Sequence, residues 1–210
     1  MNPKKDEKKV AGEVKNPNHP QKGDHIRVEP IRDPKDIWAI KKILADSPRD
    51  LLLFTMGINN GLRVGDLLRL RVGDVRYVKE GDYITVKEAK TGKENILMIN
   101  KVVHGALKNF LEKMNPQDED FLFASKKRDK GHITIQRANA MVKEWTRAIN
   151  LKGNYGAHTL RKTFGYVQRT VYKVGFEVLA KRFNHSSPAV TMRYLGIADK
   201  EVNGILKNEI

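Results

Sequence analysis

The chain has 210 residues, with 40 lysines and arginines against 25 aspartates and glutamates, and a net charge of +15 at pH 7. Hydrophobic residues make up 40% of it, which is enough for one domain with a buried core and excludes a wholly disordered chain. The absence of cysteine excludes disulfides, thiolate nucleophiles and cysteine-ligated metal sites. A positive charge of this size attracts polyanions, so we expect a nucleic acid as the partner, either DNA or RNA.

The N-terminal segment is polar, with four lysines among its first nine residues. No apolar period runs through it, so we expect a flexible basic arm over residues 1–33. The longest nearly apolar run of the chain, residues 51–58, is far shorter than the roughly 20 residues that cross a bilayer, and no secretory signal is present. We therefore expect a cytoplasmic protein without a membrane partner.

The segment after residue 33 predicts three helices. Asp33-Pro34 is typical of a helix cap followed by proline at the first helical position, and residues 37–44 give that helix one apolar face that includes Trp38. Ser47-Pro48 begins a second helix. Its residues 51–56 are apolar on most sides, so it should be central and buried. A third, short helix follows the turn that ends at Gly61.

The pattern then changes to three short β-branched runs, at residues 75–78, 83–86 and 95–99. Turn residues at 80–82 and 91–93 separate them, which predicts a three-stranded antiparallel sheet. Helical spacing returns at 102–111 and 138–149, and three or four shorter helices are expected within 157–208. The predicted fold class is therefore mainly α (α+β), a helical domain with one small sheet.

Two segments combine side chains suited to binding a phosphate. Arg63 follows a turn and precedes Asp66 by three residues, a spacing at which the two can pair across one helical turn. His158 and Arg161 lie at i and i+3, on one helical face, so both can reach one anion. Each pattern taken alone also fits an ordinary surface ion pair or a solvated helix start.

Two further segments carry proton-transferring groups. Lys90 lies at the tip of the predicted hairpin, between Ala89 and Thr91. His185, in Asn184-His185-Ser186-Ser187, precedes Tyr194 by nine residues. Taken alone, a turn lysine is usually solvated and a tyrosine among apolar residues usually belongs to a core.

The order Arg, Lys, His-x-x-Arg, His, Tyr resembles the catalytic domain of the tyrosine recombinases, the phage integrase family. Residues 61–63 with 66–67 resemble that family's first arginine motif, 158–161 its H-x-x-R motif and 183–187 its L-G-H-S segment. Asn184 replaces the usual glycine of that segment, and we expect the turn to persist because asparagine tolerates a left-handed backbone. The resemblance extends from about residue 34 to the C-terminus. It implies a catalytic domain over 34–210 that ends in a tail helix at about 198–210.

The resemblance implies a site-specific recombinase that breaks and rejoins DNA through a 3′-phosphotyrosyl intermediate, without metal, ATP or another cofactor. Tyr194 would be the nucleophile, while Arg63 and Arg161 would stabilise the charge on the phosphoryl oxygens. The resemblance also implies that Lys90 is the general acid, with Lys87 and Lys93 as competitors. It implies that His158 assists with the tyrosine proton and that His185 donates a hydrogen bond to the phosphate. Asp66 would hold Arg63 in place.

The implied partner is double-stranded DNA, so we expect association with the nucleoid. We expect further DNA contacts from basic residues of the hairpin, of the loop near residue 128 and of the helix after His158, namely Lys93, Lys126, Lys127, Arg128 and Lys162. Self-association on DNA, as a tetramer in the recombining complex, is implied too. The apolar stripe of the tail suggests that it docks on a neighbouring subunit.

Several alternatives stay open at this point. The chain could be a non-catalytic DNA-binding relative, a type IB topoisomerase-like nicking and closing enzyme, or a basic RNA-binding protein. Only about 33 residues precede the predicted catalytic domain. The sequence is therefore consistent with a minimal recombinase or with the catalytic fragment of a longer integrase.

Overall fold

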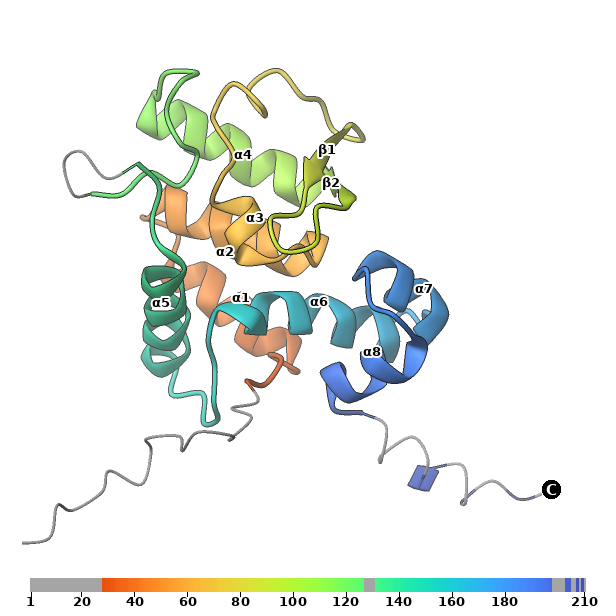
Figure 1. Ribbon diagram of the computed structural model, residues 1–210. Coiled ribbons are helices and arrows are strands. Elements are labelled where there is room, and N and C mark those ends of the chain that lie inside the picture. The colour runs from red at the N-terminus through yellow and green to blue at the C-terminus, as the bar shows by residue number, and fades with distance from the viewer. Residues whose placement is uncertain (1–27, 127–130, 198–202, 205–206, 208, 210) are drawn as a thin grey trace, which may run out of the picture.

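The computed structural model describes residues 28–126, 131–197, 203, 204, 207 and 209. Within them the chain forms a body of helices with one small hairpin at its edge (Figure 1). The elements are, in order, α1 (Pro34–Ile43), α2 (Pro48–Asn60), α3 (Val64–Leu67), β1 (Tyr83–Lys87), β2 (Glu94–Met98), α4 (Lys101–Met114), α5 (Ile135–Ala148), α6 (Ala157–Thr170), α7 (Phe176–Arg182) and α8 (Pro188–Leu195). The mainly α class is confirmed. None of the described helices is long and apolar enough to cross a membrane.

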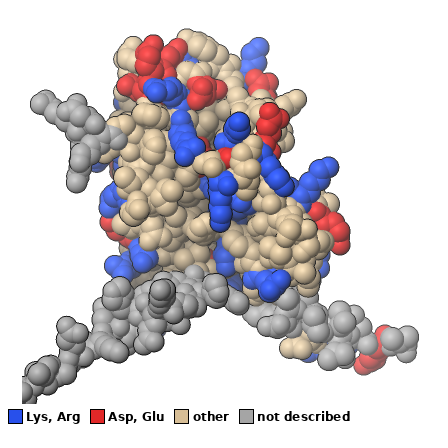
Figure 2. Space-filling model, viewed as in Figure 1, with Lys and Arg blue, Asp and Glu red and all other residues tan. Residues whose placement is uncertain are grey.

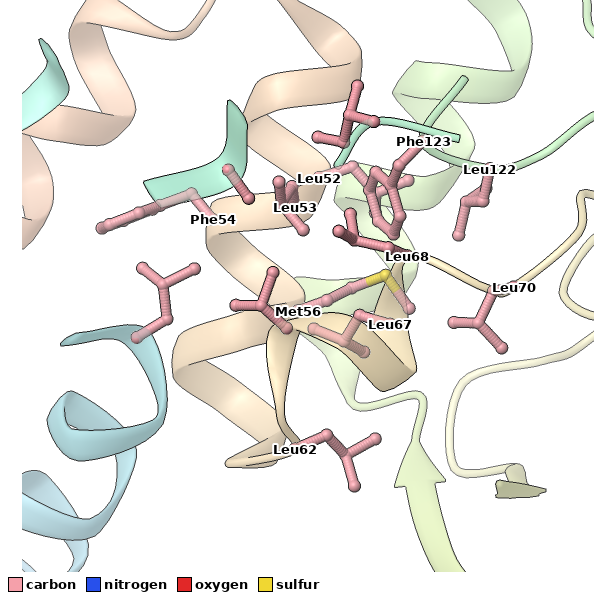
Figure 3. Packing of buried hydrophobic residues seen from close by; sticks show 14 of the residues in the cluster. Leu52, Leu53, Phe54, Met56, Leu62, Leu67, Leu68, Leu70, Leu122 and Phe123 are labelled. Atoms are coloured by element: carbon pink, nitrogen blue, oxygen red, sulfur yellow. The ribbon is translucent and has the colours of Figure 1, made fainter. Parts of the chain in front are cut away.

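Helix α2 forms the centre of the main core, as its apolar sequence predicts. It packs against α4 on one side and α6 on another. Leu52, Leu53, Phe54 and Met56 are all buried, and they meet side chains from α3 and from the loop around Phe123 (Figure 3). Burial of an apolar side chain of this size stabilises a fold by about 1.5–3 kcal/mol, so this helix fixes the positions of the elements around it.

The N-terminal helix confirms one expectation and corrects another. The Asp33 side chain accepts a hydrogen bond from the backbone N–H of Lys35, and Pro34 occupies the first turn, as predicted. Trp38, however, is 64% exposed and does not share the apolar face, because it lies two positions away from the buried Ile40. Lys42 lies over its ring instead, 5.4 Å from the ring centre.

The sheet has two strands in the described residues, so the predicted third strand at 75–78 is wrong. β1 and β2 pair antiparallel, with Tyr83 opposite Met98. Residues 75 and 76 instead donate their backbone N–H groups to the Val72 carbonyl, which makes this segment a turn. Val75 is completely buried. Its β-branched side chain therefore packs in the core from a loop rather than from a strand.

The segment before α1 is packed, which corrects the boundary of the predicted arm. Ile31 is completely buried, and its backbone N–H donates to Thr163 Oγ1 at 2.9 Å. The backbone N–H of Glu29 donates to the Asn154 carbonyl at 2.7 Å. Residues 28–33 therefore belong to the folded body. The rest of the predicted arm and most of the predicted tail helix at 198–210 lie outside the described residues.

A second, smaller apolar cluster joins α7 and α8 to the C-terminal part of α6. Its buried members are Phe176, Leu179, Phe183, Leu195 and Ile197. In Figure 1 these two helices lie at one end of α6, beyond the hairpin. The molecule thus has a large core centred on α2 and a small one that carries the C-terminal helices.

Gly61 ends α2 in the left-handed conformation, with φ +61°, and a Cβ there would lie 2.4 Å from Phe164 Cδ1. A left-handed alanine costs roughly 1–2 kcal/mol by itself. Because the added Cβ also clashes with Phe164, we expect Gly61→Ala to lower the free energy of unfolding by more than that amount. Chemical denaturation measures this change. Gly105→Ala is the control, since Gly105 is helical with open space around its Cβ position. Equal stability of the two variants would contradict the prediction.

Candidate active site

A pocket of about 240 Å³ opens between α3, the hairpin and the start of α6. Four of the six predicted catalytic residues line it, namely Arg63, Lys90, His158 and Arg161. Segments up to about 100 residues apart in the chain therefore meet here. Of the three candidate lysines, only Lys90 lies on the pocket lining, and Lys87 and Lys93 do not.

Arg63 is placed by the turn that joins α2 to α3. It is the N-cap of α3 with an extended backbone, at φ −68° and ψ 139°. Its Nη1 donates to Glu88 Oε2 at 2.5 Å, and the Arg63 side chain is 20% exposed while Glu88 is completely buried. The guanidinium is thus held at one nitrogen by a buried carboxylate.

Asp66 does not hold Arg63, contrary to the prediction. The i, i+3 rule applies to two helical residues, and Arg63 leaves the helix axis because its backbone is extended. Asp66 Oδ1 instead accepts a hydrogen bond from the backbone N–H of Ala89 at 2.9 Å, and its Oδ2 has no partner among the described residues. Asp66 therefore ties the hairpin to α3, one residue before Lys90.

Glu88 contacts the candidate site directly, although no sequence motif identified it. It accepts hydrogen bonds from Arg63, from Thr91 Oγ1 at 2.7 Å and from Asn95 Nδ2 at 2.9 Å. Burial alone would raise the pKa of its carboxyl, but these hydrogen bonds outweigh burial and lower the pKa to about 2. The inward alternation of Ile84 and Val86 in β1 continues to Glu88, one residue beyond the strand, and a charged residue in that alternation is the signal that the sequence offers.

Arg161 is almost completely buried, with 2% of its surface exposed. Its Nη1 donates to the Gly61 carbonyl and its Nη2 to the Phe183 carbonyl, both at 2.7 Å. The guanidinium carbon also lies 4.5 Å from the centre of the Phe183 ring. Arg161 therefore joins the end of α2 to the end of α7, and it also presents a positive charge to the pocket.

His158 lies at the exposed mouth of the pocket, on the first turn of α6. The protein around its ring lowers the pKa, and the charges of Arg161, Arg63, Lys162 and Lys90 lower it further. The neutral imidazole is favoured as a result. A neutral imidazole can accept a proton, which agrees with the role that the sequence predicts.

His185 follows a left-handed turn at Asn184, with φ +51°, so the expected tolerance of asparagine is confirmed. The Nδ1 of His185 lies 2.9 Å from Thr191 Oγ1, which fixes the plane of the ring. Burial, followed by the charges of Arg161 and Arg63, lowers its pKa to about 4. The ring is therefore neutral at physiological pH.

Tyr194 lies on α8, with its ring against those of Phe183 and His185, at 5.7 and 5.2 Å between centres. Its hydroxyl is buried and has no hydrogen-bond partner among the described residues. Burial raises the pKa of the phenol to about 12, while the charges of Arg161 and Arg63 oppose this rise. Tyr194 does not line the pocket itself but packs on the same Phe183 ring as Arg161.

The predicted DNA contacts divide into three groups. Lys93 and Lys126 are exposed, while Lys127 and Arg128 lie outside the described residues. Lys162 is only 7% exposed, and its Nζ lies 5.0 Å from the centre of the Tyr194 ring. Lys162 therefore packs under the tyrosine in this structure and does not face a solvent-borne partner, contrary to the prediction.

The surface over the site is basic. Figure 2 shows Lys and Arg side chains gathered in the middle of the face that carries the hairpin, with acidic side chains toward the top and one edge. No group of three or more potential metal-ligating side chains occurs in the part of the chain that the structure describes. On the pocket lining, Arg63, Lys90, His158 and Arg161 supply basic side chains and Asp66 supplies an acidic one.

Comparison with known proteins gives one consistent result. The family model described as "Phage integrase family" matches residues 33–201. The chain is 36% identical over 186 residues to the probable integrase/recombinase YoeC of Bacillus subtilis (strain 168), covering 87% of this chain and 97% of that protein. It is 29% identical over 171 residues to tyrosine recombinase XerC of Caldanaerobacter subterraneus subsp. tengcongensis, covering 77% of this chain and 46% of that protein.

A solved structure shares the fold. The site-specific recombinase XerH, in a post-cleavage complex with its palindromic difH substrate, aligns with a TM-score of 0.66 over 86% of this chain and 53% of that one, at 18% identity. Together with the ordered site residues, these matches show that the chain belongs to the phage integrase family of tyrosine recombinases. Membership supports a role in site-specific DNA recombination.

The lowered pKa of His185 gives a pH-dependent prediction. A histidine in an unfolded chain titrates at about 6.5, so as the pH falls from 6.5 toward 4 the unfolded state takes up a proton before the folded state does. The free energy of unfolding therefore falls over this range, and His185→Gln loses that part of the dependence. NMR titration of the His185 Hε1 signal should give a midpoint near 4, and a midpoint at or above 6 would contradict the assignment.

Proposed function

We propose that the protein is a tyrosine-type site-specific recombinase that breaks and rejoins DNA strands through a covalent 3′-phosphotyrosyl intermediate at Tyr194, without metal or ATP. The observation that carries the proposal is the placement of the buried Tyr194 hydroxyl within the field of Arg161 and Arg63. A phosphodiester brought to this place would meet a nucleophile and two permanent positive charges together.

In the proposed reaction the phenolic oxygen of Tyr194 attacks the phosphorus of one DNA strand. A Tyr194 Oη–P bond forms as the bond from phosphorus to the 5′-oxygen breaks, which leaves a free 5′-hydroxyl. The bond energy of the phosphodiester is retained in the protein–DNA bond, so a second 5′-hydroxyl can displace the tyrosine without an energy source.

Proton transfer accompanies both halves of this exchange. The phenol, with its pKa raised to about 12, must lose its proton during attack, and the neutral His158 at the pocket mouth is suited to accept it. The leaving 5′-oxygen takes a proton from Lys90, the one candidate lysine that lines the pocket. His185 donates a hydrogen bond to the phosphate.

In this proposal the guanidinium groups of Arg161 and Arg63 stabilise the five-coordinate transition state. Arg161 has used one hydrogen bond on each side of its fork, to the carbonyls of Gly61 and Phe183, and is therefore rigid before DNA arrives. Among the described residues Arg63 donates to Glu88 through Nη1, which leaves its other nitrogens for a phosphoryl oxygen. Preorganised charge of this kind avoids the cost of rearrangement during the reaction.

The proposed partner is double-stranded DNA in the nucleoid, drawn by the net charge of +15 and positioned by surface cations that include Lys93 and Lys126. We assign catalysis to residues 34–210 and propose that four subunits assemble on two duplexes during strand exchange. In this assembly the tail at about 198–210 docks on a neighbouring subunit, which couples the position of Tyr194 to assembly.

Covalent trapping tests the proposal. The probe is a pool of nicked duplexes of random sequence, in which cleavage near the nick releases a short fragment and prevents religation. The wild-type chain should form a protein–DNA adduct that survives denaturation, and Tyr194→Phe should form none while keeping its affinity for duplex DNA. Absence of a wild-type adduct would leave a non-catalytic DNA-binding protein, whereas relaxation of any supercoiled plasmid without a defined site would favour a topoisomerase.

Replacement of Lys90 tests the general acid. On the duplex selected by trapping, Lys90→Ala should slow adduct formation by about 100-fold or more, because general acid catalysis contributes about 10²–10⁴-fold. A bridging 5′-sulfur leaves as a thiolate without protonation, so it should restore the rate of Lys90→Ala. Lys87→Ala and Lys93→Ala are matched controls on the same hairpin. If either behaves as predicted for Lys90→Ala, the acid is assigned to the wrong lysine.

A further inference from the structure

Glu88, one residue beyond β1, and Asn95, on β2, make contacts that none of the roles above uses. Glu88 has no exposed surface on its side chain, and its two oxygens accept from three donors, on Arg63, Thr91 and Asn95. With a pKa of about 2, the carboxylate carries its charge at any physiological pH. It is therefore a fixed negative charge directly behind one of the two arginines of the site.

Asn95 continues this chain of contacts to α7. Its Nδ2 donates to Glu88 Oε1 at 2.9 Å and to the Arg182 carbonyl at 3.3 Å. Its Oδ1 accepts from Arg182 Nη1 at 2.5 Å. Arg182 also donates from Nε to the Asn60 carbonyl at 3.1 Å and from Nη2 to the Ile96 carbonyl at 2.8 Å. One asparagine thus connects the carboxylate behind Arg63 to the last residue of α7.

These contacts join two parts of the site that have separate cores. Arg63 and Lys90 belong to the large core through α3 and the hairpin, whereas His185 and Tyr194 belong to the small cluster of α7 and α8. That cluster packs on the large core mainly through α6. Beside the Arg161 contacts, the hairpin-to-α7 contacts give a second connection between the halves, and this connection is polar and directional.

We propose that Glu88 and Asn95 are positioning residues, which act through Arg63 and Arg182 to hold the arginine and lysine half of the site in register with the half that carries Tyr194. The inference rests on the proposed function for its effect on catalysis. The chemistry of Glu88 is specific, because three donors converge on it. An amide of the same size has only one oxygen and would turn its NH₂ toward one of those donors.

Kinetics on the trapped duplex test the proposal through Glu88→Gln and Asn95→Ala. Misplacement of a catalytic group by about 1 Å costs about 100-fold, so we expect adduct formation to slow by about that factor while duplex affinity is unchanged. The bridging 5′-sulfur duplex should not restore either variant, because the defect lies in the position of Arg63 and Tyr194 rather than in protonation of the leaving group. Restoration by sulfur, or wild-type rates in both variants, would overturn the inference.

Glu94→Gln is the matched control, since Glu94 lies on the same hairpin but is exposed. It should cleave at the wild-type rate. Should Glu88→Gln fail to fold, Asn95→Ala decides the matter alone, because it removes the side-chain link from Glu88 to α7. The ion pair of Glu88 with Arg63 stays in place, as do the Arg182 contacts with the Asn60 and Ile96 carbonyls.

Amide hydrogen exchange tests the connection without DNA. In Glu88→Gln and Asn95→Ala, exchange over α7 and α8 should be faster than in the wild type, while exchange over α2 is unchanged, because only the smaller cluster loses an attachment. Equal exchange over α7 and α8 in the variants, the wild type and Glu94→Gln would overturn the inference. This result stands apart from the proposed function, whose failure would appear as the absence of a Tyr194 adduct in the wild type.

Discussion

The buried guanidinium of Arg161 is the constraint on which the rest of the site depends. It donates at 2.7 Å to carbonyls at the end of α2 and at the end of α7, and it packs on the Phe183 ring that His185 and Tyr194 also touch. A charge with 2% exposure is costly unless its donors are satisfied. The fold therefore has to bring those two helix ends together around it.

One physical cause explains the unusual protonation of the neighbouring groups. Loss of surrounding water favours the neutral form of the buried Tyr194, of the half-buried His185 and, through the protein around its ring, of His158. The nearby positive charges reinforce this effect for the histidines and oppose it for the phenol. Glu88 differs from these groups, because the hydrogen bonds that it accepts keep the carboxyl ionised despite burial. The site thus combines the cationic arginines, two imidazoles whose neutral form is favoured, and the neutral phenol of Tyr194. An approaching phosphate would meet all of these groups.

Three expectations from the sequence differ from the structure, each for a physical reason. The β-branched run at 75–78 was expected to form a strand, but burial of Val75 from a turn satisfies the same preference for an apolar environment. Asp66 was assigned to Arg63 from helical spacing, which does not apply at an N-cap. Lys162 was assigned to DNA, yet a lysine on a helix that is buried on several sides lies over a tyrosine ring instead.

By itself, the sequence determined the order of the candidate arginine, histidine and tyrosine motifs, the central place of α2 and the turn at Asn184, because motif spacing, apolar periodicity and residue-specific backbone preferences are local properties. The tertiary structure alone decided which carboxylate holds Arg63, which lysine lines the pocket and how the hairpin is joined to α7. These are contacts between residues 25 to 87 positions apart, and no local preference specifies which distant partner a side chain will meet.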